Sequence, residues 1–105
     1  MNDRIHRVVI TGASSGIGLD MARAFHALTV ALAAELARHK IRVNTLAPGI
    51  IRTPLIPDAD SLAAIHPLGR VGEVRDTSEA ALYLATAGFV TGTTLAVDGG
   101  YSHGR

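Results

Sequence analysis

The feature that most constrains the fold of this chain is a glycine-rich segment. It lies directly between a short apolar run and a long stretch without Pro or Gly. Arg7–Ile10 is rich in β-branched residues, and Gly12, Gly16 and Gly18 follow it at once. No Pro or Gly then occurs from Leu19 to Lys40. This order predicts a buried strand, a tight turn and one long helix over residues 16–39.

The remaining sequence predicts further short elements of both kinds. Ile41–Ala47 alternates apolar and polar residues as a strand does, until Pro48 and Gly49 stop it. Beyond it we expect an irregular segment over 50–78 with a short helix near Ser61–Ile65, a helix over Glu79–Ala87 capped by Ser78, and a strand over Thr93–Val97. The predicted fold class is α/β, a single domain over residues 1–105 with about three parallel strands and one unusually long helix.

Composition excludes several function classes. Ten Lys and Arg against nine Asp and Glu give a net charge of +1, which is too little for a basic face that binds nucleic acid. The absence of Cys excludes disulfides and thiolate metal sites. Residues 1–7 lack the apolar region of an export signal, and the uncharged stretch 80–97 is interrupted by glycines. We therefore expect a cytoplasmic protein without a membrane or nucleic-acid partner.

The glycine-rich segment has the composition of a phosphate-binding loop. Glycines let the backbone approach a pyrophosphate closely, and the first N–H groups of the following helix face its negative charge. The position of Gly12, Gly16 and Gly18 between a strand and a helix favours nucleotide binding over an ordinary turn.

Four segments together resemble the short-chain dehydrogenase/reductase family, in that family's order. They are Thr11–Gly18, Ile41–Gly49, Pro67–Arg70 and the stretch from Val90 to Gly100. The resemblance implies a Rossmann-like fold, oxidoreductase chemistry and NAD or NADP as cofactor. It also implies contacts to the pyrophosphate and to the nicotinamide carboxamide by ten residues: Gly12, Ser14, Ser15, Gly16, Ile17, Gly18, Pro48, Gly49, Ile51 and Thr53.

The chain departs from the family in its middle. Pro48 follows Gly18 by only 30 residues, where family members carry several further strands and helices. By resemblance, the family uses a Ser, a Tyr and a Lys four residues after that Tyr, but here the single lysine is Lys40 and the residues four positions after Tyr83 and Tyr101 are Ala87 and Arg105. We therefore predict a truncated homologue that keeps the nucleotide loop and has no catalytic residues of the family type.

The long predicted helix suggests self-association. A helix over residues 16–39 would be about 36 Å long, whereas strands of 5 to 7 residues span about 17 to 23 Å. We expect Met21, Phe25, Leu28, Leu32 and Leu36 to form one apolar stripe. A strip of small residues beside it, Ala24, Ala27, Ala31 and Ala34, would pack against a second copy and help complete the sheet. The alternative function is therefore a non-catalytic protein that associates with itself or with a full-length relative.

Other combinations of residues are less favoured. Gly12, Ser14 and Gly16 also match a hydrolase nucleophile turn, with Asp98 and His103 following in order, but the chain is short for that fold. Asp58, Asp60 and His66 could ligate a metal, although acidic residues in a Pro-rich loop are usually solvated. The remaining histidines are interpreted as surface residues. A reductase that uses an unrelated set of residues stays open.

Overall fold

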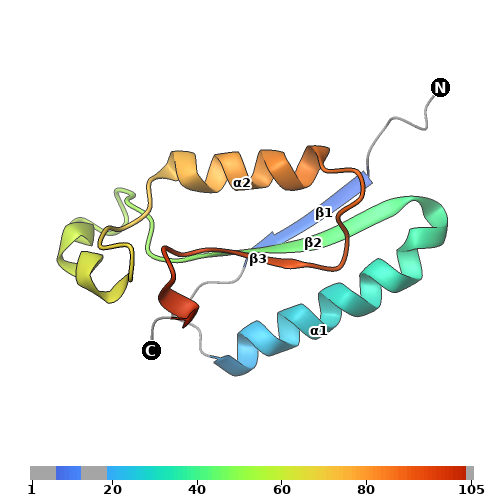
Figure 1. Ribbon diagram of the computed structural model, residues 1–105, viewed down its shortest axis with the longest axis horizontal. Coiled ribbons are helices and arrows are strands. Elements are labelled where there is room, and N and C mark those ends of the chain that lie inside the picture. The colour runs from blue at the N-terminus through green and yellow to red at the C-terminus, as the bar shows by residue number, and fades with distance from the viewer. Residues whose placement is uncertain (1–6, 13–18, 104–105) are drawn as a thin grey trace.

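The computed structural model describes residues 7–12 and 19–103, with the backbone alone for 7–12, 19–22 and 103. Strands and helices alternate along the chain (Figure 1). In order, they are β1 (Arg7–Gly12), α1 (Leu19–Leu36), β2 (Ile41–Pro48), α2 (Val74–Thr86) and β3 (Thr94–Val97). Three 3-10 segments, Ala37–His39, Ala59–Ile65 and Tyr101–His103, complete the described elements.

The three strands form one parallel sheet in the order β1-β2-β3. Helices α1 and α2 lie on opposite faces of this sheet (Figure 1). Side chains of the central strand β2 show the same division. Thr45 shares a buried hydrogen bond with Thr29 of α1, whereas Arg42 bonds to main-chain carbonyls of α2. The fold is therefore a three-layer α/β arrangement, which confirms the predicted class.

The core is small and centred on β2. Positions 42–46 are all buried, and the buried apolar side chains include Val43, Leu46 and Leu84. Three of those five β2 positions carry polar side chains, Arg42, Asn44 and Thr45. Since buried polar groups must be hydrogen-bonded, much of the packing depends on specific polar contacts.

The strands form close to where the sequence predicts them, but the helices differ. Helix α1 ends at Leu36 rather than at residue 39, and the chain leaves its 3-10 extension through Lys40 in the left-handed conformation, at φ 63°. The expected helix residues 16–18 lie outside the described part. The eighteen described residues of α1 span about 27 Å and the eight residues of β2 about 26 Å, so the described helix is no longer than the strand beside it.

Helix α2 begins five residues before the predicted Glu79. Its N-cap is Glu73, whose side chain accepts from the backbone of Asp76, while the Asp76 carboxylate accepts from the Glu73 N–H at 2.8 Å. This reciprocal pair satisfies two N–H groups at the helix start. Ser78, the predicted cap, lies inside the helix and donates to the Val74 carbonyl.

The face of α1 that meets the sheet agrees only in part with the predicted stripe, of which Leu32 and Leu36 are half-buried. Thr29 and Ala33 are its buried residues in the part whose side chains are described, and Phe25 is half-buried. Leu28, placed in the stripe by its spacing, is 52% exposed. The small residues Ala24, Ala27, Ala31 and Ala34 are exposed as predicted for a strip beside the core face. No helix in the described residues is long and apolar enough to cross a membrane.

Candidate functional site at the carboxyl edge of the sheet

The carboxyl ends of all three strands meet at one edge of the sheet. Gly12 pairs with Leu46, and Pro48 pairs with Val97. In parallel α/β sheets this edge is where ligands bind. The structure thus brings Gly12 and the Pro48–Thr53 segment to the same edge. The other predicted loop residues, Ser14, Ser15, Gly16, Ile17 and Gly18, lie outside the described part.

Main-chain hydrogen bonds hold the Pro48–Thr53 segment in place. The Gly49 N–H donates to the Val97 carbonyl at 3.0 Å, and the Arg52 N–H donates to the Gly72 carbonyl at 2.8 Å. Gly72 returns a bond to the Ile50 carbonyl, so that Ile51 forms an isolated bridge with Gly72. The Pro48–Thr53 segment is therefore bonded to β3 on one side and to the segment around Gly72 on the other, and it extends β2.

Gly49 is required for this packing by close contact. A Cβ atom at Gly49 would lie 2.9 Å from the Asp98 Cα and 3.1 Å from the His66 Nε2. The backbone Cα of Asp98 cannot yield as a flexible side chain could. An alanine at Gly49 would therefore displace the segment.

His66 closes the other side of the segment. Its ring is 2% exposed, its Nε2 accepts from the Ile50 N–H at 3.2 Å, and its Nδ1 lies 3.1 Å from the Leu62 carbonyl oxygen. The sequence suggested only a metal ligand here. The residue is instead part of the packing around Ile50, which no pattern in the sequence indicates.

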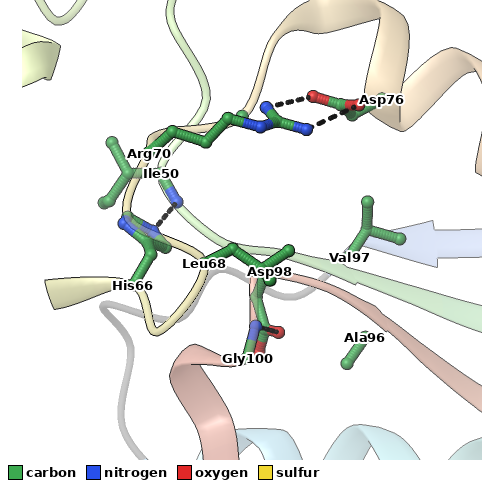
Figure 2. Close-up of a pocket in the computed structure, with 11 residues that line it drawn as sticks. Ile50, His66, Leu68, Arg70, Asp76, Ala96, Val97, Asp98 and Gly100 are labelled. Carbon is green, nitrogen blue, oxygen red and sulfur yellow. Dashed lines mark hydrogen bonds and ion pairs between the residues drawn. The ribbon is translucent and has the colours of Figure 1, made fainter. Parts of the chain in front are cut away.

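A cavity of about 370 Å³ opens beside this segment (Figure 2). Arg70 lies at its rim and donates to the Asp76 carboxylate at 2.9 Å, while Asp98 lies on the β3 side. Its lining includes Ile50, His66, Leu68, Arg70, Gly72, Asp76, Ala96, Val97, Asp98, Gly99 and Gly100. The volume suits a small ring or one end of a larger ligand, because whole drug-sized ligands occupy pockets of about 300 to 1,000 Å³.

Charged side chains around the site are paired with one another. Arg52 donates to both oxygens of Asp60, the shorter contact being 2.6 Å, and to Glu73 at 3.0 Å. The hydrogen bonds that Arg52 donates to Asp60 and Glu73 raise the pKa of Arg52, and the bond to Asp60 lowers the pKa of that carboxyl group. Arg70 likewise lowers the pKa of Asp76. Ion pairs thus hold the loops that carry the cavity.

The two alternative sites gain no support from the described residues. No group of three or more metal-ligating side chains occurs there, and His66 and Asp60 bond to protein partners. The carboxylate of Asp98 accepts from the N–H groups of Gly100 and Ser102, each at 3.0 Å, and so holds the turn after β3. Ser14, the nucleophile of the hydrolase alternative, lies outside the described part.

The lysine and one tyrosine lie at opposite ends of the sheet. Lys40 directly precedes β2, whereas Tyr101 follows β3 near the carboxyl edge. The eight residues of β2 separate these ends by about 26 Å. Tyr83 is on α2 and is 54% exposed. Within one chain, Lys40 therefore cannot contact Tyr101.

Thr53 has the chemistry expected of a cofactor contact. It is half-buried, its carbonyl accepts from the Ile56 N–H at 3.0 Å, and its hydroxyl makes no intramolecular hydrogen bond to the described residues. A hydroxyl can donate to a carbonyl or phosphate oxygen. Thr53 itself is not among the residues that line the cavity, whereas its neighbour in the segment, Ile50, is.

Comparison with solved structures gives the same fold. ElxO with NADP bound is 28% identical, with a TM-score of 0.80 over 96% of this chain and 49% of that one. The ligand-free aldohexose dehydrogenase of Thermoplasma acidophilum is 26% identical, with a TM-score of 0.78 over 95% of this chain and 50% of that one. The match therefore covers about half of each solved structure.

Sequence comparison identifies the family. A 3α-hydroxysteroid dehydrogenase of Mediterraneibacter gnavus is 47% identical over 100 residues, which cover 88% of this chain and 40% of that protein. The chain thus spans less than half the length of this relative. A family profile described as enoyl-(acyl carrier protein) reductase matches residues 23–102. With the four motifs and the NADP-bound neighbour, these matches show that the chain is a truncated member of the short-chain dehydrogenase/reductase family.

Proposed function

We propose that this chain binds NAD or NADP at the carboxyl edge of its sheet without performing the proton transfer of its family. The cofactor would contact the ten residues implied by the family motifs, Gly12, Ser14, Ser15, Gly16, Ile17, Gly18, Pro48, Gly49, Ile51 and Thr53. The observation that carries the proposal is the meeting of Gly12 and the Pro48–Thr53 segment at one sheet edge, beside the cavity. Residues 1–105 would act as a single dinucleotide-binding domain.

The proposed loss of turnover follows from the tyrosines and the lysine. A phenol that transfers a proton near neutral pH needs a neighbouring cation to lower its pKa. Tyr101 is separated from Lys40 by the length of β2, and the residue four positions after Tyr83 is Ala87. The relatives are named as dehydrogenases or reductases, but this chain would keep their nucleotide site and not their reaction.

Fluorescence titration with NADH and NADPH tests the proposal. We expect saturable binding to the wild-type chain and at least about tenfold weaker binding to Gly49→Ala, because the added Cβ displaces the Pro48–Thr53 segment. Gly88→Ala is the matched control, since a Cβ there meets nothing within 4 Å. Absence of saturable binding to the wild type would refute the nucleotide site. Ketone-dependent oxidation of NADPH at an ordinary enzymatic rate would refute the loss of turnover.

A second candidate function is non-catalytic association through α1. Its outward face carries the exposed side chains of Leu28 and Val30 beside exposed alanines, and nothing in the described part of the chain covers it. The partner would be a second copy or a full-length relative. Co-purification of a tagged relative with this chain, and its loss in Leu28→Asp, would support this function; failure to associate with either partner would exclude it.

A further inference from the structure

We propose that His66 is a positioning residue: one neutral form of its ring fixes the main chain at Ile50 and so sets the geometry of the Pro48–Thr53 segment. The consequence for nucleotide affinity rests on the proposed function. The positioning itself rests on contacts within the described chain and can be tested without a ligand.

The two hydrogen bonds of the ring determine its tautomer. The partner of Nδ1 is the carbonyl oxygen of Leu62, which can only accept, so Nδ1 must carry the hydrogen. The partner of Nε2 is the N–H of Ile50, which can only donate, so Nε2 must present its lone pair. The buried ring can make both bonds only as the neutral Nδ1–H form.

The ring lies among three segments that are distant in sequence. It follows the 3-10 helix Ala59–Ile65, and its Nε2 lies where a Cβ on Gly49 would come within 3.1 Å. The Tyr101 ring, after β3, is tilted by 47° to it with the centroids 5.8 Å apart. His66 thus connects the loop, the end of β2 and the C-terminal turn (Figure 2).

The bond to Ile50 is the part of this contact that reaches the proposed site. Ile50 directly precedes Ile51, and its carbonyl accepts from Gly72 on the other side of the segment. Without an acceptor at the position of Nε2, the Ile50 N–H loses its partner, and the segment keeps only its main-chain bonds to Val97 and Gly72. Thr53 would then lose its fixed position relative to the cavity.

Two amides can replace the ring and separate its two bonds. A glutamine oxygen reaches about as far as Nε2 and can accept from Ile50, whereas an asparagine nitrogen reaches about as far as Nδ1 and can donate to Leu62. His66→Gln therefore preserves the Ile50 bond, and His66→Asn removes it. His26→Asn is the control, since the exposed His26 ring bonds to Thr94 and neither residue lines the cavity.

The test combines nuclear magnetic resonance with nucleotide titration. In the wild type we expect nitrogen shifts that show a protonated Nδ1 and an unprotonated Nε2. We expect hydrogen exchange at the Ile50 amide to stay slow in His66→Gln and His26→Asn, and to rise about tenfold in His66→Asn. Affinity for NADPH should follow the same order, with a loss of about tenfold confined to His66→Asn.

The outcomes separate this inference from the proposed function. An Nε2–H tautomer in the wild type would overturn the positioning role, and that measurement needs no variant to fold. Equal protection of Ile50 in the Gln and Asn variants would overturn it as well. If the wild type binds no nucleotide, the proposed function fails, while the tautomer and the exchange rates still decide the role of His66.

Discussion

At the scale of single residues, the buried guanidinium of Arg42 has an unusual environment. It donates to the carbonyls of Leu84, Ala85 and Val90 at 2.7, 2.8 and 3.0 Å. These acceptors lie at the end of α2 and just beyond it, where helix carbonyls lack intrahelical partners and the helix dipole is negative. A positive charge from β2 thus caps a helix on the other layer and joins sheet to helix.

Replacing Arg42 should cost more stability than replacing any exposed arginine. Arg42→Met removes three donors and leaves buried carbonyls unsatisfied, so we expect the free energy of unfolding to fall by about 3 kcal/mol. Arg38→Met is the control, since the exposed Arg38 bonds only to His39 among the described residues, and its effect should stay within about 0.5 kcal/mol. Urea unfolding followed by circular dichroism measures both values, and equal losses would contradict the capping role.

Acid should weaken the start of α2 through Asp76. Its pKa is held below the ordinary 3.8 by the hydrogen bond from Arg70 and by the Glu73 N–H. A lowered folded-state pKa means that the stabilisation is present above the unfolded-state value and is lost as pH falls through the folded-state pKa. We expect the unfolding free energy of the wild type to fall as pH drops through the ordinary carboxyl range and on below 3.8, and to fall less in Asp76→Asn.

Glu79→Gln serves as the comparison in the same acid titration. Glu79 pairs with Arg75 on an exposed helix surface, at 3.1 Å. Because exposed ion pairs of this kind contribute little to stability, the unfolding free energy of Glu79→Gln should depend on pH in the same way as that of the wild type. A wild-type curve as flat as that of Asp76→Asn would show that the Arg70 pair contributes nothing to folding.

At the scale of elements, the beginning of α2 has a precise cause that can be tested. Glu73→Ala removes one half of the capping box together with the exposed ion pair to Arg52, and should destabilise the protein by about 1 kcal/mol, mostly through the lost cap. Ser78→Ala removes only a hydroxyl that bonds back to Val74 within the helix, so it should be nearly neutral. Thermal unfolding of both variants compares the two proposed caps. A larger loss of stability in Ser78→Ala than in Glu73→Ala would instead support the predicted helix start at Glu79.

The sequence predicts the strands better than the helix boundaries. β2 ends at Pro48, one residue past the predicted end at Ala47, and Pro followed by Gly is a local signal in the sequence that a strand is ending. The start of α2 instead depends on a reciprocal bond between Glu73 and Asp76, while Ser78 offers an equally plausible local cap. The spacing on α1 places Leu28 in the core stripe, but the buried contact of Thr29 with Thr45 selects another face.

The hand of the connections could not be predicted either. The strand order advances from β1 to β2 to β3 in one direction, while α1 and α2 cover opposite faces (Figure 1). The two parallel crossovers therefore have opposite hands, although about 98% of such connections are right-handed. Hydrophobic periodicity carries no information about this choice. Polar bonds from Arg42 to the end of α2 fix it in the folded chain.

At the scale of the whole molecule, the site was only partly predictable. The motifs singled out Gly12 and Pro48–Thr53, and the parallel pairing of the strands brings both to one edge of the sheet. His66 and Arg70 join that site through a loop whose path depends on the ion pairs of Arg52 and on packing against Gly49. These contacts are between residues far apart in sequence and leave no periodic signal.

Self-association through α1 is a prediction for the whole molecule. In light scattering after size-exclusion chromatography, we expect the wild type at tens of micromolar to be a dimer or larger. Leu28→Asp should shift it to a monomer, because it places a charge on the outward apolar face of α1. Leu82→Asp makes the same change on exposed α2 and should leave the mass unchanged. A monomeric wild type would rule out the assembly.

The placement of α1 and α2 on opposite faces has a consequence for how such a protein could be regulated. The cavity is bounded by the first turn of α2, by β3 and by the loops after β2 and β3, and no α1 side chain that the structure describes lines it. A subunit seated on the outward face of α1, at Leu28, would not touch the described residues that line the cavity. Assembly through α1 should then change the affinity of the cavity for a ligand very little, and ligand binding should change the strength of assembly equally little. Substitutions that alter one of these two equilibria can therefore accumulate without altering the other.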